Sequence, residues 1–198
     1  FSSIGMSIGI GGGSIVSRSL GKGEKDKALL SFNNQITLTI ILAIVALIVG
    51  LFFKVPILNA FGAKGGIMPL AISYFNIVIL GIPFLALSMM ANNNLRAEGK
   101  AKVAMVALLI PSALNIFLDY VFIDMMNWGM EGAGWATSIS YLGCAIFIGY
   151  FYISGKGELK IRPQLFKIDN TIVSEIFSIG SVNLVRQGTI SLLAIVLN

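Results

Sequence analysis

The chain has 198 residues, of which 56% are hydrophobic and only 12% charged, and its mean hydropathy is +0.88. This composition excludes a soluble globular domain and predicts an integral membrane protein. The net charge of +5 does not indicate a nucleic-acid ligand, because the basic residues lie in short segments between apolar runs, where they orient a chain in the bilayer.

Six predominantly apolar runs predict membrane helices. They cover residues 1–17, 28–53, 67–95, 103–123, 132–155 and 171–198. The first run, which is rich in glycine and serine, is interpreted as the end of a helix, and the last still continues where the sequence stops. Runs of this length cross a bilayer as helices, whereas a transmembrane β-barrel shows alternating segments of about ten residues. The sequence therefore predicts an all-α, polytopic transmembrane bundle.

The connecting segments alternate in basic charge. Segments 18–27, 54–64, 96–102, 124–131 and 156–170 hold four, two, three, no and four Lys or Arg residues. By the positive-inside rule, the first, third and fifth of these segments are cytoplasmic. Segment 156–170 also alternates basic and apolar residues, which is typical of a linker lying on a lipid surface.

Cysteine, histidine and the chain ends add further limits. Cys144 is the only cysteine and there is no histidine, so we expect no disulfide framework and no metal cluster. Carboxylates would then have to bind and release any protons coupled to the function. The chain begins with Phe1 rather than methionine and stops at Asn198 within an apolar run, so we expect it to be part of a longer polypeptide.

The predicted span 103–123 contains a carboxylate. Asn115 and Asp119 are four residues apart and share a helix face, and Thr137 lies on the next span, an antiparallel neighbour. Carboxylate, amide and hydroxyl oxygens are the hard ligands that Na⁺ or a proton site would use, and an acid at membrane depth indicates function. A second interpretation stays open, in which Asp119 lies near the outer interface and only hydrogen-bonds a neighbouring backbone.

Three further features carry predictions. Arg186 interrupts the last span, with Asn183 and Gln187 nearby, and either contacts substrate in a cavity or pairs structurally; its long stem favours structural pairing. Glycines recurring every four residues predict a helix face for close packing, namely Gly5, Gly9 and Gly13. A run of amides predicts a helix end, at Asn92, Asn93 and Asn94.

Ordered motifs resemble the MATE family of multidrug and toxin extrusion transporters. They are GGGSIVSRSLGKGEKDKA, NNNLRAEGKAKVAM, NIFLDYVFI and WGMEGAGWATSIS. SVNLVRQGTISLLAIVLN likewise resembles the opening helix of the second lobe in bacterial members related to the MepA type. The resemblance covers nearly the whole chain. Tyr120 departs from it, because proline is common after the acid of the NIxLD motif.

The resemblance implies two pseudo-symmetric six-helix lobes around a central cavity in the bacterial plasma (inner) membrane. Residues 1–155 would be the first lobe without its first helix, 156–170 the interlobe linker and 171–198 the first helix of the second lobe. Asn115, Asp119 and Thr137 match a cation site of the family's first lobe. The protein would then be no enzyme and hold no cofactor or metal apart from Na⁺ or H⁺ as coupling ion. Its partners would be organic cations as substrates, the lipid bilayer and the rest of the same polypeptide.

Two other functions remain open at this stage. A flippase of lipid-linked precursors would keep the architecture, but a cavity lined with several Arg and Lys residues would favour such cargo, and only Arg186 lies deep in a span. A non-transporting membrane scaffold would show a tightly packed apolar surround at Asp119 rather than an aqueous cavity.

Overall fold

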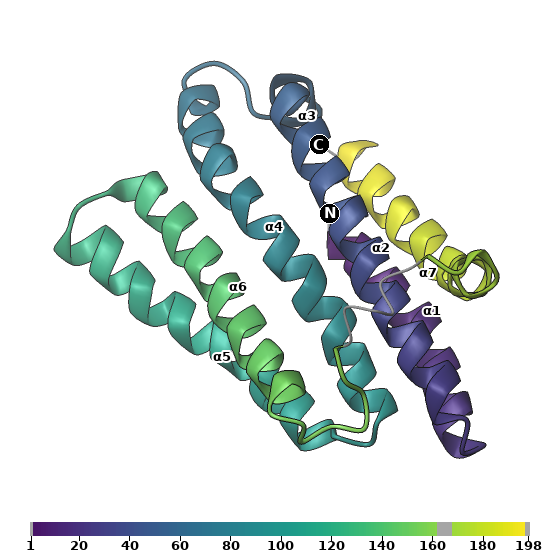
Figure 1. Cartoon of the computed structure of the whole chain (residues 1–198). Coiled ribbons are helices and arrows are strands. Elements are labelled where there is room, and N and C mark those ends of the chain that lie inside the picture. Colours follow the sequence, from purple (N-terminus) through teal and green to yellow (C-terminus); the bar gives the residue numbers. More distant parts are fainter. Residues whose placement is uncertain (1, 162–167, 197–198) are drawn as a thin grey trace.

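The structure, a computed structural model, describes residues 2–161 and 168–196 and confirms the all-α bundle (Figure 1). Its long helices are α1 (Ser2–Gly21), α2 (Lys25–Phe52), α4 (Ile67–Ala97), α5 (Ala101–Asp119), α6 (Gly129–Ile153) and α7 (Asn170–Val196). Two short elements join them: α3 (Lys54–Ala60) and the π-helix η1 (Tyr120–Met125), which continues α5 directly.

Helix α4 lies at the centre of the arrangement. It packs along α6 on one side and along α1 and α2 on the other, while α5 packs mainly on α6 and α7 on α1 (Figure 1). In the described part, four helices are long and apolar enough to cross a membrane: α2, α4, α5 together with η1, and α6. The many glycine and serine residues of α1 and the polar residues of α7 lower the hydropathy of these two helices.

The glycine face of α1 lies against α4, which confirms the predicted close packing of this face and identifies its partner. A Cβ atom on Gly9 would lie 2.8 Å from the Cα of Met90, and one on Gly5 would collide with the backbone of Ala86. Gly13 is less crowded, since its Cβ would be 3.5 Å from the carbonyl oxygen of Asn93. Glycine therefore lets the two helix backbones approach closely.

The three segments predicted to be cytoplasmic meet at one end of the bundle. Lys25, at the start of α2, forms a 3.0 Å ion pair with Glu158 in the segment after α6. Glu98, at the turn between α4 and α5, accepts hydrogen bonds from the backbone of that same segment. The arrangement of the helices thus agrees with the side that the charge pattern assigns to these segments.

Candidate functional site

Asn115 and Thr137 lie next to each other across the interface of α5 and α6. The Asn115 Nδ2 donates a long hydrogen bond of 3.5 Å to the Thr137 hydroxyl, which in turn donates to the backbone carbonyl of Ala133 at 2.9 Å. The side-chain amide of Asn115 and the hydroxyl of Thr137 therefore lie next to each other on facing helices, which confirms the prediction that the two helices are neighbours.

Asp119 lies one helical turn beyond Asn115, at the last residue of α5. Its side chain is half-buried, and the buried Oδ1 has no hydrogen-bond partner among the described residues. A buried acceptor without a partner costs about 1–3 kcal/mol and more when it is charged, so such an atom needs an explanation. A proton or a cation bound at this oxygen would remove that cost.

The backbone changes its winding directly after Asp119. Residues 120–125 form a π-helix, in which the N–H of Met126 reaches back five residues to the carbonyl of Val121 at 3.0 Å. Unlike proline, Tyr120 keeps a backbone N–H, which donates to the carbonyls of Ile116 and Phe117 and so continues the bonding of α5 up to the π-helix. π-Helical turns occur frequently at functional sites.

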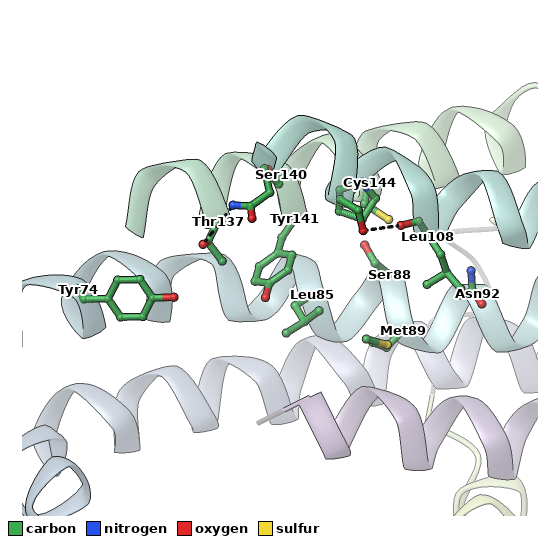
Figure 2. A pocket seen from close by; sticks show the side chains of 13 residues that line it. Tyr74, Leu85, Ser88, Met89, Asn92, Leu108, Thr137, Ser140, Tyr141 and Cys144 are labelled. Carbon is green, nitrogen blue, oxygen red and sulfur yellow. Dashed lines mark hydrogen bonds between the residues drawn. The ribbon is translucent and has the colours of Figure 1, made fainter. Parts of the chain in front are cut away.

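A cavity of about 420 Å³ opens between α4, α5 and α6 beside the Asn115–Thr137 pair (Figure 2). Among the described residues, tyrosine, methionine, small polar and apolar side chains line it, and none of them is charged. The lining consists of Tyr74, Leu85, Ser88, Met89, Asn92, Leu108, Pro111, Ser112, Asn115, Thr137, Ser140, Tyr141 and Cys144. Asp119 is not part of this lining. Two of the three predicted cation ligands thus border the cavity, and the carboxylate lies one turn farther along α5.

The second predicted group, Arg186 with Asn183 and Gln187, lies on α7. Arg186 donates to the Asn183 Oδ1 at 3.2 Å, and the buried Asn183 donates to the Ser7 hydroxyl of α1 at 3.0 Å. Arg186 and Asn183 also line a shallow pocket between α1 and α7. No acid lies within ion-pair distance of Arg186 in the described part. The side chain of Gln187 lies outside the described residues.

A buried amide pair links α2 to α4, and sequence analysis did not identify it. Gln35 and Asn94 exchange two hydrogen bonds, of 2.7 Å and 3.3 Å, and both side chains are fully buried. Asn92 donates to the carbonyl of Ala104 on α5 at 2.7 Å. The amide run lies near the end of α4, which continues to Ala97, but the role predicted for it is wrong: two of the amides bond across helices instead of satisfying terminal backbone groups.

A family model described as MatE matches residues 1–121. The multidrug export protein MepA of Staphylococcus aureus (strain MRSA252) is 29% identical over 177 residues, which cover 89% of this chain and 39% of that protein. The chain thus spans about two fifths of the length of the curated relatives it matches.

Solved structures of MATE transporters share the fold. One, described as MATE in the bent conformation, superposes with a TM-score of 0.91 at 28% identity and covers 96% of this chain and 43% of that chain. An inward-facing multidrug resistance MATE family transporter of the MOP superfamily gives a TM-score of 0.85 at 29% identity, covering 90% and 41%. The apolar helices and bacterial relatives make this a multi-pass protein of the bacterial plasma membrane. The chain belongs to the MATE family of multidrug and toxin extrusion transporters.

Proposed function

We propose that the full-length protein is a secondary antiporter that exports amphipathic, cationic small molecules in exchange for Na⁺ or H⁺. Asp119 binds the coupling ion, and Asn115 and Thr137 supply further oxygen ligands. The observation that carries this proposal is the buried, unpartnered Oδ1 of Asp119, one turn from the Asn115–Thr137 pair. Structural acids normally find a hydrogen-bond partner, so an orphaned carboxylate oxygen favours a site that an ion fills.

The cavity beside the pair supports the substrate class. The described residues of its lining include no Arg or Lys, which argues against an anionic cargo. The rings of Tyr74 and Tyr141 and the flexible thioether of Met89 suit varied amphipathic molecules. The cavity borders Asn115 and Thr137 rather than Asp119 itself, and its position one helical turn from that carboxylate supports transport over a purely structural scaffold.

Coupling between the ion and the substrate follows from the position of Asp119 next to the cavity. Asp119 ends α5 and precedes the π-helix, so neutralising its charge changes the cost of burying that junction. Na⁺ or H⁺ therefore favours the state of the protein in which the Asp119 carboxylate is neutralised. An organic cation in the cavity favours the other state, in which that carboxylate is free. Two ligands that prefer different states drive an exchange.

The test uses the full-length protein in lipid vesicles. With Asp119→Asn, efflux of tetraphenylphosphonium driven by an imposed Na⁺ or pH gradient should be lost. Asp124→Asn is the matched control, because Asp124 lies only five residues away in η1 but is exposed. Gradient-driven efflux that survives intact in Asp119→Asn would contradict the coupling role.

A further inference from the structure

A second, apolar cavity of about 160 Å³ lies between α2, α4 and α6, and Ile161 of the segment after α6 also lines it. Among the described residues of its lining, only Ser88 and Tyr152 are polar, and the Tyr152 hydroxyl donates to the backbone carbonyl of Ala91 at 3.4 Å. Gly149 leaves room on the α6 side, because a Cβ atom there would meet no other part of the described chain within 4 Å. The cavity therefore has space for an apolar chain rather than for a polar ligand.

The cavity continues into an exposed face of α2. Ile36, Ile40 and Ile44 are spaced four residues apart and share one face of that helix. Ile36 and Ile40 line the cavity, while Ile40 and Ile44 are 40% and 49% exposed. Because α2 is long and apolar enough to cross a membrane, this exposed face lies in the hydrocarbon of the bilayer. Lipid acyl chains are therefore the molecules that surround the mouth of the cavity.

Basic residues lie at the end of this cavity that the charge pattern assigns to the cytoplasm. Lys160 is exposed and directly precedes the lining residue Ile161, and Lys156 is exposed as well. Glu158 lies between these two lysines in the sequence, but it forms an ion pair with Lys25 at 3.0 Å. Unpaired lysines at a cytoplasmic membrane surface attract the phosphates of anionic lipids. The charge at this end of the cavity is thus complementary to an anionic headgroup.

We propose that the cavity binds one acyl chain of an anionic phospholipid of the cytoplasmic leaflet, whose phosphate lies at Lys160 and Lys156. The lining residues of α2 run from Phe32 to Ile40, about 12 Å along the helix axis, so a substantial part of one chain is covered. Ser88 lines both this cavity and the larger one shown in Figure 2. The bound chain therefore supports the wall that α4 and α6 form around the larger cavity. The proposal does not depend on the role of Asp119.

Photo-crosslinking of the full-length protein in lipid vesicles tests the site. The probe is phosphatidylglycerol with a diazirine in one acyl chain, and phosphatidylcholine with the same chain is the comparison. Mass spectrometry of the unmodified protein should find the label concentrated on the cavity-lining residues of α2 and α6 rather than on the exposed Ile44. An excess of tetraphenylphosphonium should leave this label unchanged.

Three variants locate the chain and the headgroup. Gly149→Phe fills the cavity from its α6 wall and should lose the label. Ile146→Phe is the matched control, because it places the same ring on the exposed face of α6 and should keep the label. Lys160→Gln removes the charge and leaves the backbone carbonyl that Asn33 of α2 bonds, so the preference for phosphatidylglycerol over phosphatidylcholine should fall about fivefold.

Four results would overturn the proposal. Label confined to exposed helix faces of the unmodified protein would show that no acyl chain enters the cavity, whether or not the variants fold. Label that survives Gly149→Phe would place the chain elsewhere, and label displaced by tetraphenylphosphonium would make the cavity a substrate site. Equal labelling by the two lipids would contradict the anionic headgroup. Because the readout is lipid labelling rather than transport, a failure here is distinct from a failure of the proposed antiport.

Discussion

Replacing single glycines on one face of α1 measures how closely that helix approaches α4. Gly9→Ala places a Cβ atom 2.8 Å from the Cα of Met90 and 2.9 Å from the Asn93 Nδ2, both closer than such atoms pack. Gly13→Ala, one turn along the same face, places its Cβ 3.5 Å from the nearest atom, an ordinary contact. The two substitutions are chemically identical and differ only in the space available.

The expected free-energy changes separate the helix preference of alanine from the crowding of its methyl group. Alanine is favoured over glycine within a helix by about 1 kcal/mol, and this gain is common to both variants. Overpacking a tight contact costs about 1–3 kcal/mol and applies to Gly9→Ala alone. Gly13→Ala should therefore be neutral or stabilising, and Gly9→Ala should have a free energy of unfolding lower than that of Gly13→Ala by about 1–3 kcal/mol.

The assay is unfolding of the purified full-length protein by sodium dodecyl sulfate in mild detergent, followed by circular dichroism. Equal stabilities for Gly9→Ala and Gly13→Ala, or a larger loss for Gly13→Ala, would refute the packing of α1 on α4 described here.

Unfolding by sodium dodecyl sulfate also tests the buried amide pair and a surface ion pair, and a transport assay tests Thr137. Gln35→Leu and Asn94→Leu should each cost about 1–3 kcal/mol, because each leaves the buried side-chain carbonyl oxygen of the other amide without its donor. The double variant should cost less than the sum of the two, and strict additivity would contradict the pair. Arg18→Ala should lower the free energy of unfolding by less than about 1 kcal/mol, because its ion pair with Glu175 is exposed. A larger loss would contradict the weak contribution expected of this ion pair. Thr137→Val should weaken the ion dependence of transport in vesicles while Thr137→Ser retains it, and equal behaviour of the two would remove the hydroxyl from the site.

Local spacing and span order explain which features the sequence could predict. The four-residue repeat of glycines defines a helix face whatever its partner, so close packing at Gly5 and Gly9 was predictable. Asn115 and Thr137 were predictable neighbours because a short connection makes the helices that carry them antiparallel. In both cases the information lies within one helix or one hairpin.

Other features depend on partners far away in the sequence. Asn94 was interpreted as part of a helix end because amides are common there, but its partner Gln35 lies 59 residues earlier. The contacts of Glu98 with the backbone of the segment after α6 were missed because their donors are backbone N–H groups, which every residue but proline has. The π-helix after Asp119 leaves no strong local signal beyond Tyr120 in place of proline.

The most direct test of the central claim is whether Asp119 links ion binding to substrate binding. In the purified full-length protein, the dissociation constant of tetraphenylphosphonium should rise with Na⁺ concentration or with falling pH, because ion and substrate favour different states. This dependence should disappear in Asp119→Asn and persist in Asp124→Asn. The same ion dependence in Asp119→Asn as in the unmodified protein would contradict the account.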